Sequence, residues 1–394
     1  MGTAAQPRTE NAGPPSASTF ALYVHWPFCR SKCPYCDFNS FEGPEVDQRR
    51  WRRALLTELR FFADQTSDRL VSSVFFGGGT PSLMAPDTVA AILEAARAHW
   101  RWTEEVETTL EANPNSTDAG RFGAYREAGI NRISLGVQSF DDEVLAFLGR
   151  SHDAAQARGA IEAARDAVPR VSFDLIYALP GQTMAAWSAQ LKEAIAFAPG
   201  HLSAYQLTIE PGTPFHEQGV AAAEEDNAAD QYELTGEMLS AAGLLPYEIS
   251  NHARPGQECC HNLSYWRGHD YVGLGPGAHG RLTTARGTEA LAQTADPNTW
   301  LEAVERSGHG TAERSLLRPE ERRDELVMMG LRTAEGVNRA RFRRLTGLDI
   351  EDALDRDGLA RLLGTGLVAL DERGLRVPHN AWLRADFIHR VLLS

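Results

Sequence analysis

The sequence of 394 residues lacks any apolar run of about 20 residues, the length needed to span a bilayer. Its first 19 residues also lack the basic segment followed by an apolar segment that marks a secretory signal. Positive charge is scarce, because 39 Lys and Arg stand against 53 Asp and Glu, a formal net charge of −14. This balance argues against a nucleic-acid backbone or an anionic membrane surface as the main partner. We therefore expect a cytoplasmic protein without a transmembrane segment that does not bind nucleic acid.

Cysteine is scarce as well, with five residues in the chain. An odd number in a long chain without a signal does not indicate a disulfide framework. Three of the five, Cys29, Cys33 and Cys36, lie within eight residues of one another. This crowding indicates metal binding in a reducing compartment.

Apolar segments of strand length alternate with amphipathic segments of helix length between residue 20 and about residue 208. The predicted strands are 20–24, 70–76, 106–111, 131–135, 171–176 and 202–207. The predicted helices are 45–63, 86–98, 117–128, 153–167 and 183–197. The alternation predicts an α/β fold of parallel β-α-β units, a partial (β/α)₆ barrel, with a complete eight-fold barrel as the alternative. Functional side chains are then expected at the carboxyl ends of the strands.

We expect four regions along the chain: a disordered tail over 1–19, a core domain over 20–220, a connecting region over 221–318 and a C-terminal domain over 319–394. The tail is rich in Ala, Pro, Thr and Ser. In the last region we predict helices at 320–332, 339–346, 358–365 and 382–393 and a ribbon of 368–370 with 375–378. This order resembles a winged helix of α+β type. Its 13 Asp and Glu balance 13 Arg, so a packing or lid domain is favoured over DNA binding.

The three clustered cysteines follow the first predicted strand with the spacing C-x₃-C-x₂-C. Iron–sulfur clusters are held by cysteine thiolates, normally four. Phe38 occupies the local position of a fourth cysteine, so one iron of a cluster would keep an open coordination site. The alternatives are a zinc site with His25 as the fourth ligand and a redox thiol loop.

The segment YVHWPFCRSKCPYCDF resembles the radical SAM superfamily and, within it, the HemN/HemW group related to oxygen-independent coproporphyrinogen III oxidase. The other motifs that carry the resemblance are FFGGGTPSL, EANP, GVQSFDDEVLAFLGRSH, FDLIYALPGQT, YQLTIEPGTPF and HNLSYW. The resemblance runs from about Phe20 to the C-terminus. It implies a radical SAM barrel with a C-terminal domain of the HemN type, one [4Fe–4S] cluster on Cys29, Cys33 and Cys36, and S-adenosylmethionine on the free iron. It also implies a reductant for the cluster, whose electron cleaves S-adenosylmethionine.

Polar residues and glycines at successive strand ends suit S-adenosylmethionine. The run Gly77–Gly79 lets a backbone approach a ligand closely, although a tight turn is the alternative. Glu111 suits the ammonium group, Arg150 a carboxylate and Asp174 a ribose hydroxyl. The related oxidase places two S-adenosylmethionine molecules near its cluster. The resemblance implies that one is contacted by Tyr23, Gly78, Glu111 and Arg150, and the second, where present, by Tyr35, Gly79, Thr80, Gln138 and Asp174.

Three features favour the heme chaperones of this group over the oxidase. The oxidase has an additional cysteine where Phe38 stands, and it has an N-terminal extension longer than the 22 residues before Tyr23. The segment His261–Trp266 matches the H-N-x-x-Y-W signature of the chaperones. His261 is then a candidate axial ligand of heme iron, with a buried core histidine as the alternative. Other candidate ligands are Cys259, Cys260, His252 and His279.

We therefore predict a protein that binds heme as cargo and transfers it to apo-hemoproteins. No catalytic residue is assigned. The main alternative is an oxygen-independent coproporphyrinogen III oxidase that forms protoporphyrinogen IX. A third alternative, an RNA-modifying radical SAM enzyme, is disfavoured by the charge of −14.

Overall fold

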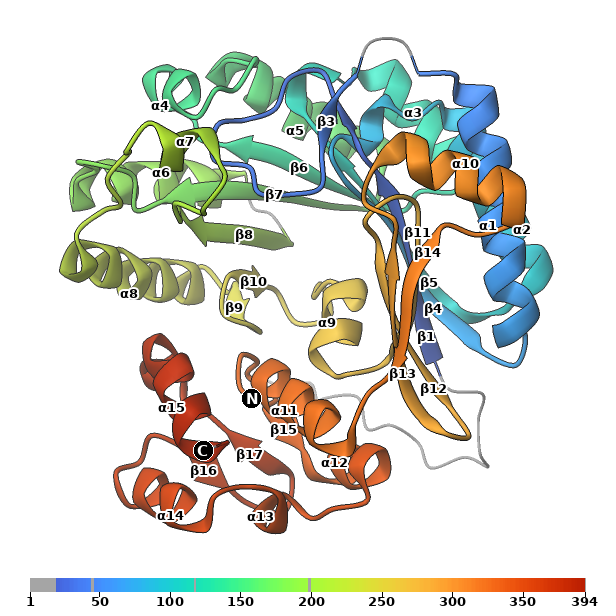
Figure 1. Cartoon of the computed structure of the whole chain (residues 1–394). Helices are drawn as coiled ribbons and strands as arrows, with labels where there is room; N and C mark the ends of the chain where they lie inside the picture. The colour runs from blue at the N-terminus through green and yellow to red at the C-terminus, as the bar shows by residue number, and fades with distance from the viewer. Residues whose placement is uncertain (1–18, 44–45, 117, 198–199, 394) are drawn as a thin grey trace, which may run out of the picture.

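A computed structural model describes residues 19–43, 46–116, 118–197 and 200–393. Apart from Thr19, the predicted tail lies outside the described residues. One sheet of twelve strands runs through the larger part of the molecule in the order β14-β13-β12-β11-β1-β4-β5-β6-β7-β8-β10-β9 (Figure 1). No helix among the described residues is long and apolar enough to cross a membrane.

Six neighbouring strands of this sheet are parallel and correspond to the six predicted strands. They are β1 (Thr19–Trp26), β4 (Leu70–Gly78), β5 (Arg101–Ala112), β6 (Arg132–Gln138), β7 (Arg170–Tyr177) and β8 (His201–Gln206). The connecting helices are α1 (Gln48–Thr66), α2 (Pro86–His99), α3 (Ala119–Ala128), α4 (Asp142–Phe147), α5 (Ala154–Ala167) and α6 (Met184–Ala196). The predicted partial barrel is therefore confirmed. The short helix α4 was not among the predicted helices.

The helices begin and end at the residues that local chemistry favours. Asp47 caps α1 by accepting hydrogen bonds from the backbone N–H groups of Arg49 and Arg50. Asp153 and Gln156 form a reciprocal capping box at the start of α5. Gly129 ends α3 in the left-handed conformation, with φ of 107°. Because the six strands are parallel, each of them delivers its last residues to the same edge of the sheet.

Short elements join the main ones near the carboxyl ends of the strands. They are β2 (Phe28–Cys29), β3 (Phe41–Glu42), two 3₁₀ turns, η1 (Pro81–Leu83) and η2 (Pro114–Ser116), and α7 (Pro214–Glu217). They lie in the segments that follow β1, β4, β5 and β8. The loops that bear polar side chains are thereby held against the sheet.

The sheet continues beyond the six parallel strands on both sides. β11 (Asp270–Leu274) pairs in parallel with β1, and β12 (His279–Thr284), β13 (Gly287–Gln293) and β14 (Thr311–Leu316) follow in antiparallel order. β10 (Asn251–Ala253) and β9 (Leu245–Pro246) extend the opposite edge. The helices of this part are α8 (Glu225–Ala241), α9 (Cys260–Trp266) and α10 (Pro297–Ser307). Residues 221–318 thus contribute strands to the main sheet.

The last part of the chain forms a separate hydrophobic core around Val327, Phe342, Leu375, Trp382 and Ile388. Its helices are α11 (Pro319–Gly330), α12 (Arg339–Thr346), α13 (Ile350–Ala353), α14 (Arg356–Gly364), the 3₁₀ helix η3 (His379–Arg384) and α15 (Ala385–Leu392). A sheet in the order β15-β17-β16 combines Val337–Asn338, Gly374–Arg376 and Ala369–Leu370. The predicted helices and ribbon are present, and this α+β unit lies beside α8 and α9 (Figure 1).

Candidate functional site

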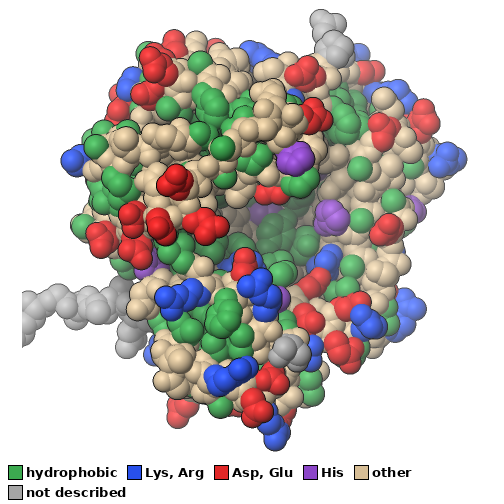
Figure 2. Space-filling view, turned by 60° about the vertical axis from the view of Figure 1, so that its left-hand side comes forward, with side chains coloured by type: hydrophobic (Ala, Val, Ile, Leu, Met, Phe, Trp, Pro, Cys, Tyr) green, Lys and Arg blue, Asp and Glu red, His purple; other side chains and the backbone are tan. Residues whose placement is uncertain are grey.

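Two cavities adjoin one another near the carboxyl ends of the parallel strands. The first, of about 380 Å³, is lined by the three clustered cysteines and by the last residues of β4 to β8, and we call it the strand-end cavity. The second, of about 700 Å³, lies between β1, α9, the start of β12 and Met329 of α11, and we call it the wide cavity. They share Phe38, Gly78, Glu111 and Tyr205. The surface is hollowed where the larger part of the molecule faces the C-terminal unit (Figure 2).

The three cysteines lie on the loop that leaves β1, and each sulfur contacts a polar group. Thr80 Oγ1 donates to Cys29 Sγ over 3.4 Å, and an Arg150 guanidinium nitrogen donates to Cys33 Sγ over 3.2 Å. Cys36 Sγ lies 3.7 Å from Ser40 Oγ. Burial raises the pKa of the Cys29 thiol, so its thiolate form depends on the positive charge of a bound metal.

The glycine run holds this loop against the end of β4. Gly79 N–H donates to Trp26 O over 2.8 Å, and a Cβ on Gly79 would lie 2.9 Å from the backbone of Pro27 and Phe28. A Cβ on Gly78 would lie 2.6 Å from the His25 ring. Gly78 and Gly79 therefore lack a side chain for two reasons. They approach the end of β1 and the residues after it closely, and they line the cavity wall. A second such approach occurs at Gly149, whose Cβ would lie 2.5 Å from Pro34.

The sulfur set suits a cluster spread over several iron atoms. Cys29, Cys33 and Cys36 all line the strand-end cavity. Within the part of the chain that the structure describes, no three His, Cys, Asp or Glu side chains converge closely enough to hold a single metal ion. His25, the fourth ligand of the alternative zinc site, has both ring nitrogens in hydrogen bonds, to Tyr23 Oη and to Asn39 O. Because both ring nitrogens of His25 are in hydrogen bonds, the loop offers three thiolate ligands without His25 as a fourth.

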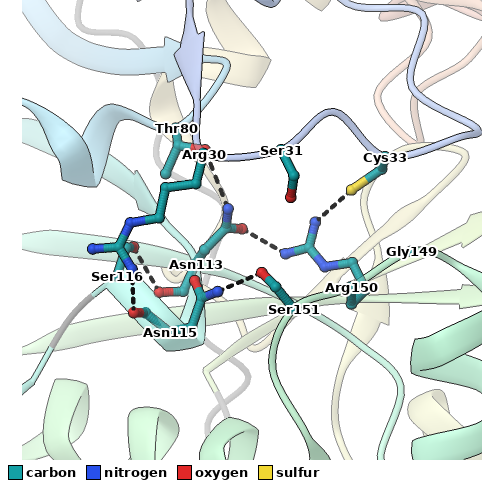
Figure 3. A pocket seen from close by; sticks show the side chains of 10 residues that line it. All are labelled: Arg30, Ser31, Cys33, Thr80, Asn113, Asn115, Ser116, Gly149, Arg150 and Ser151. Atoms are coloured by element: carbon teal, nitrogen blue, oxygen red, sulfur yellow. Dashed lines mark hydrogen bonds between the residues drawn. The ribbon is translucent and has the colours of Figure 1, made fainter. Parts of the chain in front are cut away.

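A hydrogen-bonded bridge, which the sequence motifs did not single out, joins two of the cysteine contacts. Asn113, directly after β5, accepts from Arg150 over 2.5 Å and donates to Thr80 Oγ1 over 3.2 Å (Figure 3). Arg150 also donates to Gly136 O over 3.0 Å. Asn113 thus positions both Thr80, the donor to Cys29, and Arg150, the donor to Cys33. The sequence could have indicated a role for Asn113 in the site, because it is the first polar residue after a predicted strand.

Two carboxyl groups face the same cavity, Glu111 from the end of β5 and Asp174 from β7, with β6 between the two strands. Glu111 accepts from the Gly78 N–H over 3.2 Å. Burial, with a smaller contribution from the charge of Asp174, raises the pKa of Glu111 to about 8. Burial also raises the pKa of Asp174 to about 6, against hydrogen bonding from Ser203 and the charge of Arg132. Both groups therefore favour a cationic ligand, which would stabilise their ionised forms.

Most predicted cofactor contacts line the strand-end cavity together. They are Tyr35, Gly78, Gly79, Thr80, Glu111, Gln138, Arg150 and Asp174. Tyr23 instead lines the wide cavity with Gly78 and Glu111. Gln138 has a positive φ of 67°, an uncommon backbone conformation for a residue other than glycine.

The HNLSYW motif divides between the core and the wide cavity. Asn262, Tyr265 and Trp266 line the wide cavity. His261 is only 2% exposed, stacks on Phe75 with ring centroids 4.7 Å apart and lies 3.3 Å from Ser73 Oγ through Nδ1. It lines neither cavity.

The other candidate heme ligands also separate. Cys259 and His252 are buried, and Cys259 Sγ lies 3.4 Å from Glu107 Oε1. Cys260 is half-buried and lines neither cavity. His279 is exposed and lines the wide cavity. Of the predicted heme ligands, His279 therefore has access to the larger space.

Comparison with known proteins identifies the family of this chain. Residues 23–192 match the radical SAM superfamily, and residues 317–384 match the HemN C-terminal domain. The mouse mitochondrial protein named radical S-adenosyl methionine domain-containing protein 1 is 42% identical over 99% of this chain and 91% of its own length. The heme chaperone HemW of Mycobacterium tuberculosis H37Rv is 35% identical over 97% of this chain and 96% of its own length. The chain belongs to the HemN/HemW group of the radical SAM superfamily.

Membership in the radical SAM superfamily implies a [4Fe–4S] cluster and S-adenosylmethionine. The predicted fold is also confirmed by a solved structure, coproporphyrinogen III oxidase (HemN) from Escherichia coli. Its TM-score is 0.81 over 96% of this chain and 91% of the oxidase, at 23% identity. At 23% identity, this similarity supports the same fold and says nothing about the activity. The radical SAM barrel and the HemN-type C-terminal domain therefore occur here in one continuous HemN-like arrangement.

Proposed function

We propose that this protein binds heme and transfers it to apo-hemoproteins, with the cluster and S-adenosylmethionine controlling the transfer. The observation that carries the proposal is the wide cavity. Its volume of about 700 Å³ adjoins the strand-end cavity and is lined by Tyr265, Trp266 and Tyr271. Binding sites for organic ligands are typically concave, apolar and aromatic, with a few polar groups that fix orientation.

The strand-end cavity has the groups needed to hold the cofactors. We propose that Cys29, Cys33 and Cys36 ligate the cluster while Thr80 and Arg150 donate hydrogen bonds to two of the sulfurs. Glu111 would accept from the ammonium group of S-adenosylmethionine, and Asp174 would accept from a ribose hydroxyl. When reduced, the cluster supplies one electron to S-adenosylmethionine. The chain orients the cluster and S-adenosylmethionine and separates them from bulk water.

The place of Phe38 supports the chaperone over the oxidase. Phe38 stands where the oxidase has an additional cysteine, and its side chain is 63% exposed where the two cavities meet. The relative from Mycobacterium tuberculosis is itself named a heme chaperone. The proposed partners are apo-hemoproteins that accept heme and a reductant for the cluster. We place the protein in the cytoplasm as a prediction, to be checked by fractionation of its native cells.

The decisive experiment starts from protein reconstituted anaerobically with iron and sulfide. EPR of the reduced cluster, with and without S-adenosylmethionine, tests the open iron site. Heme titration followed by incubation with an apo-hemoprotein tests transfer, and anaerobic incubation with coproporphyrinogen III tests the oxidase. We expect a cluster signal that responds to S-adenosylmethionine, heme transfer, and no turnover of coproporphyrinogen. Enzymatic turnover to protoporphyrinogen IX would replace the chaperone by the oxidase.

A further inference from the structure

Three histidines lie at or beside the wide cavity, and their ring nitrogens differ in availability. His25 uses both nitrogens, with Tyr23 Oη at 3.0 Å and Asn39 O at 2.8 Å. His261 is enclosed between Phe75, Tyr23 and Tyr265, with ring centroids 4.7, 5.9 and 4.5 Å away. His261 could therefore reach a ligand in the cavity only if α9 moved. The His25 nitrogens are occupied, whereas His261 Nε2 has no hydrogen-bond partner among the described residues but is buried and does not line the cavity.

His279 differs from both. It is exposed, it lines the wide cavity, and no hydrogen bond to its ring occurs within the described ranges. Its backbone is nevertheless fixed, because His279 begins β12 and pairs with Ala292 of β13. A Cβ on Gly273 of β11 would lie 2.3 Å from His279 O, so the neighbouring strand packs closely beneath it. A side chain that is free at its ring and held at its backbone suits a ligand position.

The charges around His279 suit a neutral imidazole. Burial and the charge of Arg281 lower its pKa, against the opposing charge of Glu313. Neutral imidazole is the form that ligates iron.

The carboxyl groups on the cavity wall are only partly ionised at neutral pH, which reduces their repulsion of an anionic macrocycle. Burial raises the pKa of Glu111 to about 8 and that of Glu248 to about 7. Both groups therefore carry reduced negative charge in the free protein. On the apolar side, Trp266 and Tyr271 offer ring faces or edges, and Met329 closes the cavity from α11. These aromatic walls fit the planar ring of a tetrapyrrole.

We infer that His279 is the axial ligand of heme iron in the wide cavity and that His261 is a packing residue of the core beneath it. This assignment rests on the proposed heme function and deepens it, because it names the binding site. It places the iron in the cavity that shares a wall with the proposed S-adenosylmethionine site. The C-terminal unit, through Met329, closes the same space.

The test is titration of the cluster-loaded protein with ferric heme, with ligation followed by EPR and resonance Raman of the heme. His279→Ala is expected to weaken binding by about tenfold or more and to remove the histidine-ligated spectrum. His279→Gly should regain that spectrum when imidazole is added, which a merely structural role would not produce. The matched control is His99→Ala, an exposed histidine at the end of α2 that lines neither cavity.

His261→Phe separates the two candidate ligands, because phenylalanine keeps the ring packing and removes both nitrogens. We expect it to retain the wild-type heme spectrum. An unchanged spectrum in His279→Ala, or loss of histidine ligation in a folded His261→Phe, would overturn the assignment while heme transfer by the wild type continued to support the chaperone. Failure of the wild type to bind heme at all would instead refute the proposed function itself.

Discussion

The two cavities are built in different ways, although they share a wall. The strand-end cavity is formed by residues just after consecutive strands, and its sulfurs are held by short polar contacts such as Arg150 to Cys33 at 3.2 Å. The wide cavity is assembled from distant segments, including β1, α9 and α11. A site made by successive strand ends is specified locally, whereas a site made between distant segments depends on how they pack. Changes to one should therefore leave the other largely intact.

The largest expected effect is loss of the cluster in Cys33→Ala. Removal of one of three thiolate ligands should abolish stable cluster binding, measured as iron and sulfide per chain after anaerobic reconstitution. Heme affinity should stay within about twofold, because the altered residue does not line the wide cavity.

The control for this variant is Cys260→Ala, which changes a half-buried cysteine that lines neither cavity. It should load the cluster normally. Parallel loss of cluster and heme in Cys33→Ala would show that the two sites depend on one another.

The strand-end cavity was the part that sequence could predict, because its residues lie in short motifs at strand ends. Eight of the nine predicted S-adenosylmethionine contacts line it, and the exception is Tyr23. Asn113 was missed even though it stands in a quoted motif. Its importance comes from two partners, Thr80 and Arg150, that are far away in the sequence.

The wide cavity could not be predicted, since it depends on elements with weak periodicity. The strand β13, GTEALAQ, has no β-branched apolar residue, and β12 begins with His-Gly. Tertiary pairing with β11 and β14 decides their structure. His261 and Trp266 are five residues apart on α9, so they point in different directions around the helix. The motif alone does not say which of them faces the core.

Next in size is the effect of adding one methyl group behind the cysteine loop. In Gly79→Ala the new Cβ meets the backbone of Pro27 and Phe28 at 2.9 Å, and backbone cannot easily move aside. We expect a loss of about 1–3 kcal/mol in the free energy of unfolding, measured with denaturant.

Gly159→Ala in α5 is the matched control, because nothing lies within 4 Å of its new Cβ. It should stabilise the protein by about 0.5–1 kcal/mol through improved helix propensity. If both variants destabilised equally, tight approach of the glycine run to the cysteine loop would not be the cause.

A smaller effect is expected from Arg150, which links Cys33, Asn113 and Gly136. In Arg150→Gln the donor to the sulfur is lost, so the cluster potential should fall and S-adenosylmethionine should bind about tenfold more weakly. Arg150→Lys keeps the charge but not the planar fork, and we expect an intermediate result.

Voltammetry of the cluster and a binding titration measure the two effects of Arg150. Arg158→Gln, which breaks a pair with Glu193 elsewhere on the barrel, is the control and should leave both unchanged. A normal potential in Arg150→Gln would mean that the contact with Cys33 does not tune the cluster.

The last effect is a dependence on pH and concerns Glu111, a residue that lines both cavities. Its pKa is raised to about 8, so below that pH the free carboxyl is largely protonated and a cationic ligand must displace a proton. The affinity for S-adenosylmethionine should rise with pH, on the order of tenfold between pH 6 and pH 7.5. Glu111→Gln keeps an acceptor for the Gly78 N–H but removes the titration, so its affinity should be nearly flat over this range. Heme, whose carboxylates are repelled as Glu111 and Glu248 ionise, should show the opposite trend and bind the wild type more weakly as the pH rises over the same range. A pH dependence that survives in Glu111→Gln would assign it to another carboxyl, with Asp174 the nearest candidate.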